Sequence, residues 1–226
     1  CEKPLCLTSH ELDLIIEQSE KKPNLHLMLG FNRRFSPLIK KMKNLLSTII
    51  DAKSVVITVN AGEIPRTHWT QDPSIGGGRI IGEACHFIDL ARHLIGHPII
   101  SYHVHKMPNI LGTLREDDKV SIVLTFEDGS IATIHYFANG HKSFPKERVE
   151  VFVSGRVLQL DNFIYLKGWG WRGFKSMRLW KQNKGQSECA LAFLEAVKES
   201  KTSPIPKDEI FEVSRLSIMV AEAAKG

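Results

Sequence analysis

Apolar and polar residues alternate with a period of two in six segments between Ser54 and Leu160. This period is typical of strands that bury one face and expose the other. The predicted strands cover residues 54–61, 99–106, 119–126, 130–137, 148–154 and 157–160. Glu127-Asp128-Gly129 joins the third to the fourth and indicates a tight hairpin, because Asp-Gly readily adopts positive φ. The chain is therefore expected to build a mainly antiparallel sheet.

Helical periodicity interrupts and follows these strands at residues 82–95, 187–199 and 208–224. The last segment places Ile210, Val213 and Val220 on one face, after the stop signal Pro204-Ile205-Pro206. No internal repeat is present. We predict an α+β fold with an open sheet and helices on one face. The uncovered face is expected to form a homodimer or homotetramer.

The first part of the chain has a different pattern. Thr8-Ser9-His10-Glu11 has the spacing of a capping box, and a helical period follows until Lys21-Lys22-Pro23. Residues 25–31 are largely apolar and predict a buried strand of a parallel sheet, and a further helix is predicted over residues 37–47. A helix followed by a buried strand is half of a βαβ unit, so this piece cannot form a doubly wound sheet by itself.

Composition excludes several classes of protein. The 226 residues contain 42% apolar residues, enough for one large domain, or for one domain and a remnant of another. No apolar stretch approaches the roughly 20 residues that span a bilayer, and residues 1–20 lack a secretory signal pattern. We therefore expect a cytoplasmic protein with no membrane partner. The four cysteines show no CxxC spacing and are expected to be reduced thiols.

The formal charge of +5 raises the question of an acidic partner. Lys40, Lys41 and Lys43 are clustered, but they alternate with apolar residues as on a helix with one solvated face. We therefore expect no nucleic-acid partner. A positive chain is equally compatible with a phosphorylated substrate.

Three short motifs occur in a fixed order along the chain. They are Glu2-Lys3-Pro4, then Gly30-Phe31-Asn32-Arg33-Arg34-Phe35-Ser36-Pro37, then Gly76-Gly77-Gly78 ahead of His86-Phe87-Ile88-Asp89. Together with Leu94-Ile95-Gly96 they resemble the Gfo/Idh/MocA oxidoreductases. Residues 134–140 and 144–148 are similar to a bacterial branch from nucleotide-sugar and surface-polysaccharide loci. The resemblance implies an NAD(P)-dependent dehydrogenase that acts on a secondary hydroxyl of a sugar or nucleotide-sugar.

Members of this family begin with a Rossmann domain of about ninety residues, whose GxGxxG turn binds pyrophosphate. The printed sequence has no such turn, and Gly76-Gly77-Gly78 lacks both a preceding apolar strand and an acidic residue about 20 positions later. We expect residues 1–32 to be the C-terminal remnant of the Rossmann domain and residues 33–226 to be the substrate-binding and oligomerisation domain. NAD or NADP is expected to bind the full-length parent, and this fragment alone is expected to be inactive.

Hydride transfer from a secondary alcohol needs a group that takes the hydroxyl proton and a donor to the oxygen. We predict His86 as the general acid/base, because imidazole titrates near neutral pH; the alternative is a core histidine. By resemblance, Lys3 would donate to the reacting oxygen; the alternative is a solvated lysine beside a turn. Pro4 would fix the corner that aims Lys3. Glu2, Lys3, Pro4 and Arg34 are predicted to contact the cofactor.

Carboxylates near His86 are the next candidates. Asp89 lies three residues beyond His86 and would bind a substrate hydroxyl or form a salt bridge. Gly82 stands where the family usually has a catalytic aspartate. Either the neighbouring Glu83 contacts the substrate in its place, or this branch does without that carboxylate.

Further substrate contacts are predicted for Arg33, His68 and Trp69. Arg33 and Arg34 would contact phosphate or sugar, and one of them would be a structural ion-pair partner. His68 and Trp69 precede the glycine run and would line the pocket, since aromatic faces bind sugars well; burial of the indole in the core is the alternative.

Two other classes of site are not supported. His103 and His105 would share one strand face, but no further ligands follow at zinc-like spacing, so no metal is predicted. No GxSxG motif of a serine hydrolase occurs. A non-catalytic domain that binds a sugar or mediates assembly remains the alternative to an enzyme.

Overall fold

The computed structural model describes residues 1–64, 68, 75–107 and 119–224. Its centre is a sheet with the strand order β2-β3-β4-β1-β5-β6-β7-β8. The strands are β1 (Ser54–Asn60), β2 (Ile99–Lys106), β3 (Lys119–Phe126), β4 (Ile131–Phe137), β5 (Glu147–Val153), β6 (Arg156–Asp161), β7 (Tyr165–Trp169) and β8 (Ser176–Arg178). β1 and β4 run parallel, and the other neighbours are antiparallel. The predicted antiparallel hairpin of β3 and β4 is confirmed.

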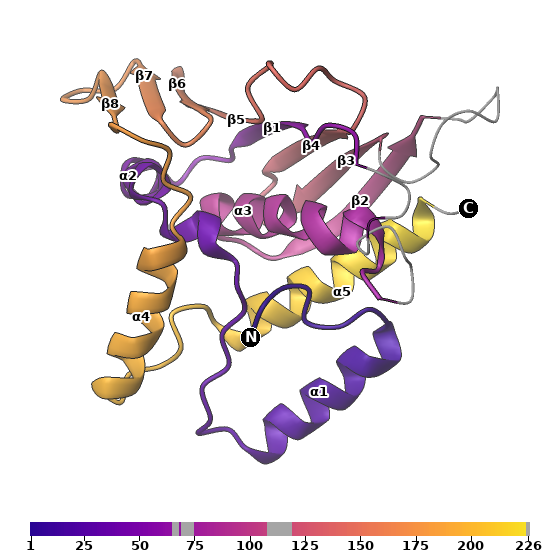
Figure 1. The fold of residues 1–226 in the computed structure, drawn as a ribbon. Coiled ribbons are helices and arrows are strands. Elements are labelled where there is room, and N and C mark those ends of the chain that lie inside the picture. Colours follow the sequence, from indigo (N-terminus) through magenta and orange to yellow (C-terminus); the bar gives the residue numbers. More distant parts are fainter. Residues whose placement is uncertain (65–67, 69–74, 108–118, 225–226) are drawn as a thin grey trace.

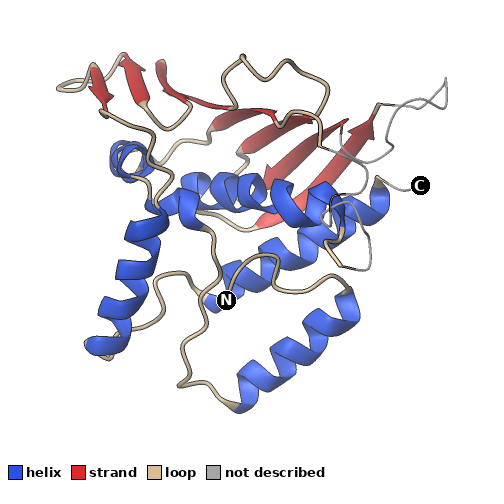
Figure 2. Cartoon of the chain, viewed as in Figure 1, coloured by secondary structure: helices blue, strands red, loops and turns tan. Residues whose placement is uncertain are grey.

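The helices cover one face of this sheet, as Figures 1 and 2 show. α3 (Cys85–Ile95) lies beneath the sheet, and α5 (Lys207–Ala223) packs against both α3 and β2. α1 (Ser9–Lys21) packs on α5, whereas α2 (Pro37–Leu46) and α4 (Gln186–Lys198) contact the short 3-10 helix η1 (Asn32–Phe35). The predicted α+β architecture is confirmed.

Strand alternation places the core between the sheet and the helices. In β1, Val55, Ile57 and Val59 are buried, whereas the residues between them are only partly covered. The outer face of the sheet leaves Ile131 and Phe152 more than 40% exposed. Two strands, β7 and β8, were not predicted, because they have only five and three residues, too few for a period of two to be recognised.

The N-terminal segment confirms one prediction and corrects another. Thr8 caps α1: its Oγ1 accepts from the Glu11 amide (3.2 Å), and its amide donates to Glu11 Oε2 (3.0 Å). The strand predicted over residues 25–31 is wrong, since this segment is extended but belongs to no sheet. Among the described residues, its backbone bonds to the backbone of another segment only at Cys1, through Met28 (2.8 Å) and Gly30 (3.0 Å), and a strand needs a longer ladder.

The cysteines are free thiols, as predicted. Cys85 and Cys189 are buried, Cys6 is half-buried and Cys1 is exposed. Burial raises the pKa of Cys85 to about 12, so this thiol stays protonated. Within the described ranges, no helix is both long and apolar enough to cross a bilayer.

Gly185→Ala is expected to destabilise the chain by about 2 to 4 kcal/mol. Gly185 precedes α4 with φ of +84°, and an added Cβ would meet backbone atoms at the end of η1, Phe35 C at 2.7 Å and the following Ser36 N at 2.5 Å. Urea unfolding measures the loss. Gly173→Ala is the matched control, because its φ of +79° is similar but its Cβ would meet open space. Equal losses in the two variants would contradict close packing at Gly185.

Candidate active site

The glycine run places the start of the chain against the helix that carries His86. Gly77 has a φ of +67°, and a Cβ there would lie 2.7 Å from Leu7 Cδ2, so only glycine leaves room for the N-terminal segment. The π-helix η3 (Ile80–Ala84) follows and leads directly into α3. The Lys3 ammonium donates a hydrogen bond to the carbonyl oxygen of Gly82, one turn before His86. The two predicted catalytic residues are thus brought to the same end of α3.

The imidazole of His86 is buried, with 6% of the residue exposed. Its ring packs edge-on against Phe31, with the centroids 6.2 Å apart. Nδ1 is buried and makes no hydrogen bond with the described residues. Desolvation and the positive charges of Arg33, Lys3, Lys184 and Lys146 lower the pKa of His86 well below 6.5. The imidazole is therefore neutral at pH 7 and able to accept a proton.

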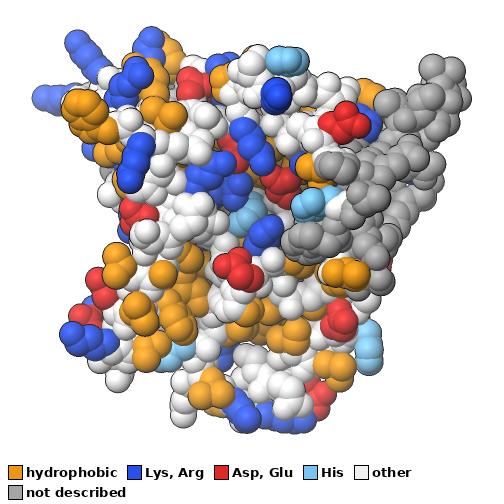
Figure 3. Space-filling model, in the orientation of Figure 1, with side chains coloured by type: hydrophobic (Ala, Val, Ile, Leu, Met, Phe, Trp, Pro, Cys, Tyr) orange, Lys and Arg blue, Asp and Glu red, His pale blue; other side chains and the backbone are white. Residues whose placement is uncertain are grey.

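A cavity of about 690 Å³ opens beside His86. Its wall includes Glu2, Gly30 and Asn32 from the N-terminal segments, and Gln186 and Phe193 from α4. Figure 3 shows basic, acidic and histidine side chains gathered around the hollowed middle of this face, above a largely apolar surface. The wall of the cavity thus combines polar groups near His86 with apolar side chains of α4.

Glu83 is held by three partners rather than pointing freely into the cavity. Its Oε2 accepts from Tyr136 (2.5 Å) and Arg79 (3.0 Å), and its Oε1 accepts from Lys146 (2.7 Å). Burial alone would raise the pKa of Glu83, but these partners outweigh it, and the pKa falls to about 2. Glu83 thus stays ionised near neutral pH and does not serve as a proton relay there.

Position 82 has little space for a larger side chain. A Cβ on Gly82 would lie 3.2 Å from the carbonyl oxygen of Gly76, which is tighter than most side-chain contacts. The glycine run and Gly82 therefore fit together, and the backbone carbonyl of Gly82 accepts the hydrogen bond from Lys3.

Asp89 and Arg34 form a buried ion pair with each other, and their contacts with ligands stay predictions. Asp89 is 1% exposed and accepts hydrogen bonds from Arg34 Nε (3.1 Å) and Nη2. Arg34 Nη1 also donates to Glu209 on α5 (2.8 Å). Both side chains are buried in the core. This burial is tolerated because their opposite charges compensate each other. The salt bridge was the alternative that the sequence left open for Asp89.

Arg33 is also buried and paired with a carboxylate, and its contact with the substrate stays a prediction. Its Nε and Nη2 donate to both carboxylate oxygens of Glu147, each at 3.0 Å, and its guanidinium lies 4.8 Å from the ring centroid of Phe87. Lys184 Nζ donates to the same carboxylate (2.7 Å). Both arginines of the motif are thus ion-pair partners, where the sequence predicted only one.

The remaining predicted residues are placed as follows. Glu2 lines the cavity beside His86. Pro4 follows a cis peptide bond and lies near Phe31, Ile81 and Cys85. His68 is exposed, and Trp69 lies outside the described residues.

Sequence reasoning missed five residues of this site. They are Arg79, Tyr136, Lys146, Glu147 and Lys184. A signal existed for Tyr136, Lys146 and Glu147, because they fall in the segments 134–140 and 144–148 that resemble the family. Arg79 stands four residues before Glu83, the spacing of a helical ion pair. No local pattern marks Lys184, whose carboxylate partner is 37 residues away in sequence.

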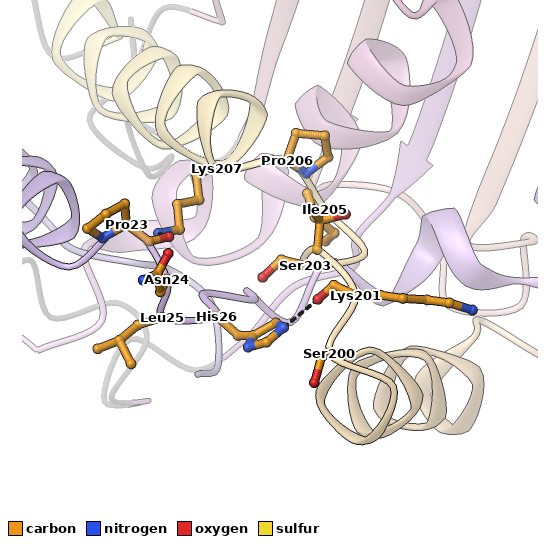
Figure 4. Close-up of a pocket in the computed structure, with 11 residues that line it drawn as sticks. Pro23, Asn24, Leu25, His26, Ser200, Lys201, Ser203, Ile205, Pro206 and Lys207 are labelled. Atoms are coloured by element: carbon orange, nitrogen blue, oxygen red, sulfur yellow. Dashed lines mark hydrogen bonds between the residues drawn. The ribbon is translucent and has the colours of Figure 1, made fainter.

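A second cavity, of about 750 Å³, lies between residues 23–26 and 200–207 (Figure 4). His26 Nε2 hydrogen-bonds the carbonyl oxygen of Lys201 (2.6 Å), and the Lys201 side chain extends away from it. Lys207 Nζ donates to the carbonyl oxygen of Pro23 (3.2 Å). None of the predicted site residues lines this cavity. The cavity beside His86 is therefore the candidate active site.

Relatives with solved structures share this fold. An oxidoreductase domain protein from Kribbella flavida has a TM-score of 0.83 at 20% identity, over 100% of this chain and 71% of that one. Levoglucosan dehydrogenase, solved in complex with NADH and L-sorbose, has a TM-score of 0.81 at 20% identity, over 100% of this chain and 70% of that one.

Sequence comparison also finds dehydrogenases among the similar proteins. Myo-inositol 2-dehydrogenase from Thermotoga maritima is 27% identical over 165 residues, which are 72% of this chain and 48% of that protein. The chain thus spans about half the length of this relative. Residues 48–158 match the model of the GFO/IDH/MocA C-terminal domain. These matches confirm the resemblance to the Gfo/Idh/MocA oxidoreductases that the motifs indicated.

Proposed function

We propose that this chain is the substrate-binding part of an NAD(P)-dependent dehydrogenase acting on a secondary hydroxyl of a sugar or nucleotide-sugar. One observation carries the proposal: a neutral, buried imidazole and a lysine ammonium lie at the same end of α3 beside a cavity. The names of the relatives support the substrate class, because they include inositol, levoglucosan and xylose dehydrogenases.

His86 and Lys3 would divide the work at the reacting hydroxyl. His86 takes the hydroxyl proton on its ring, because the neutral imidazole is the form present at pH 7. Lys3, held by the carbonyl of Gly82, donates a hydrogen bond to the oxygen as it loses its proton. A nicotinamide held beside Glu2, Gly30 and Asn32 would supply the acceptor for the hydride that leaves the carbon bearing this hydroxyl.

The cavity fits one end of that cofactor. Beside His86, Glu2 offers a carboxylate, Gly30 an accessible backbone and Asn32 an amide. The buried Nδ1 of His86 forms no hydrogen bond with the described residues. These residues would hold the nicotinamide and its ribose. We propose that a Rossmann segment binds the diphosphate, with residues 1–32 as its last part and residues 33–226 as the substrate domain. The complete protein, with that segment, is called the full-length dehydrogenase below.

The open face of the sheet is proposed as the subunit interface. Ile131 on β4 and Phe152 on β5 expose apolar side chains on it, and no helix of the described residues covers this face. A homodimer or homotetramer would bury these side chains.

Sugar-dependent reduction of NAD or NADP by the full-length dehydrogenase tests the proposal. We expect absorbance at the nicotinamide band to rise with at least one of myo-inositol, levoglucosan and UDP-N-acetylglucosamine. The 226-residue chain alone is expected to show no NADH binding in a fluorescence titration, since it has no GxGxxG turn. Folded full-length protein that binds a sugar but transfers no hydride would favour a non-catalytic binding domain instead.

A further inference from the structure

The side chains around His86 carry more positive than negative charge. The hydrogen-bonded groups on this side of α3 include five cations and two carboxylates: Lys3, Arg33, Arg79, Lys146 and Lys184, with Glu83 and Glu147. Adding Glu2, which lines the same cavity as His86, leaves an excess of two positive charges. The four groups that act most strongly on the imidazole after desolvation are all cations.

The ion cluster on the other side of α3 does not offset this excess. There Arg34 and Arg92 face three carboxylates, Asp89, Glu209 and Glu212, while Lys43 lies close to Glu209 and to a second lysine, Lys53. With both lysines counted, this cluster has no excess of negative charge. The positive charge beside the cavity is therefore not cancelled from the other side of α3, and low-dielectric walls strengthen its potential.

Only some of these cations can reach a ligand. Arg33 and Arg79 are 6% and 3% exposed, and both are already paired with a carboxylate. The Lys146 side chain is 40% exposed and the Lys184 side chain 16% exposed. Each lysine uses one of its three N–H donors on a carboxylate, Glu83 or Glu147. Lys146 is thus a tethered cation with donors left for a partner.

Lys146 also comes from the substrate domain. It immediately precedes β5, and its partner Glu83 lies in the π-helix just before His86. Because Glu83 is itself held by Tyr136 and Arg79, the position of the Lys146 ammonium relative to His86 is set by rigid elements rather than by a loop alone.

We propose that the substrate of this site carries an anionic group, a carboxylate or a phosphate, which binds the ammonium of Lys146 in the positive potential that Lys184 strengthens. The inference rests on the proposed function, which places the reacting sugar hydroxyl beside His86. An anionic group bound at Lys146 would reduce the excess positive charge. It would also hold the sugar at a second point, so that the same hydroxyl is oriented toward His86 in every binding event. Lys146 is accordingly a specificity-determining residue.

Calorimetric titration of the 226-residue chain with three probes tests this. D-glucuronate carries a carboxylate, D-glucose 1-phosphate carries a phosphate, and D-glucose carries no charge. We expect at least one anionic probe to bind about 10-fold or more tightly than D-glucose at low salt, and the preference to shrink as salt is added. The tighter of the two anions identifies the group. Equal affinities, or no binding of either anion, would overturn the inference.

Lys146→Met removes the charge and keeps the length of the side chain. It should weaken the preferred anion about 10-fold or more, whereas Lys146→Arg should retain most of the affinity. Lys181→Met is the matched control, because Lys181 is exposed and outside the site. A loss of equal size in Lys181→Met would overturn the role of Lys146. If Lys146→Met fails to fold, the wild-type comparison of charged and neutral probes still decides.

The titration needs neither nucleotide nor turnover. Anion preference without dehydrogenase activity would remove the proposed function and leave this inference standing. Turnover of neutral sugars without any preference for anions would overturn this inference and leave the proposed function standing.

Discussion

His86→Ala and Lys3→Ala are each expected to lower the turnover of the full-length dehydrogenase about 100-fold or more. The first removes the neutral imidazole that takes the hydroxyl proton, and the second removes the ammonium that the Gly82 carbonyl holds near it. Initial rates at saturating sugar and nucleotide measure the loss. Because both residues act on the reacting oxygen, the effect should fall on kcat more than on KM.

Two exposed residues of the same types provide controls for this experiment. His103 lies on β2 and Lys181 beyond β8, and both are exposed. His103→Ala and Lys181→Ala should leave kcat within about twofold, as surface changes away from a site usually do. Circular dichroism confirms folding of each variant. Unchanged turnover in folded His86→Ala or Lys3→Ala would remove that residue from the mechanism.

Glu147→Ala is expected to destabilise the chain by about 3 to 5 kcal/mol. The Glu147 carboxylate is 0% exposed and pairs with Arg33 and Lys184, so its loss leaves a buried guanidinium without a counter-charge. Urea unfolding at pH 7 measures the difference. Glu150→Ala on the same strand is the control, because that side chain is only half-buried, and its cost should stay below about 1 kcal/mol.

Acid should diminish the contribution of Glu147. Burial alone would raise its pKa, but Arg33 and Lys184 hold the pKa below the ordinary 4.5. A lowered folded-state pKa contributes stability that is present above pH 4.5 and is lost as pH falls through the folded value. The gap between wild type and Glu147→Ala should therefore narrow below about pH 4.5. A gap that stays constant to lower pH would contradict a buried ion pair.

Local patterns in the sequence predicted most of the fold. The period of two located six of the strands, and the capping box at Thr8 located the start of α1, because both depend on residues a few positions apart. Residues 25–31 show the limit of this reasoning. Their apolar run matches a buried strand, but strand formation also needs neighbouring strands. Among the described residues, only Cys1 offers them backbone hydrogen bonds from another segment.

The site was predictable only in part, because it too depends on contacts between residues that are far apart in the sequence. His86 and Lys3 could be proposed because single residues of suitable chemistry stand in recognisable motifs, and the structure places both at one end of α3. The roles of Arg33 and Arg34 were not, because their partners Glu147 and Asp89 lie 114 and 55 positions away. Whether a charged side chain meets a ligand or a counter-charge depends on such distant contacts, which no local period records.

The central claim is that Lys3 and His86 act on one hydroxyl, and a double variant tests it most directly. Groups that act as a unit lose little more when both are removed than when one is removed. We expect turnover of Lys3→Ala/His86→Ala to fall no more than about 10-fold below the slower single variant. Losses that multiply in full, to about 10⁴-fold, would show that the ammonium and the imidazole act independently and would contradict this account.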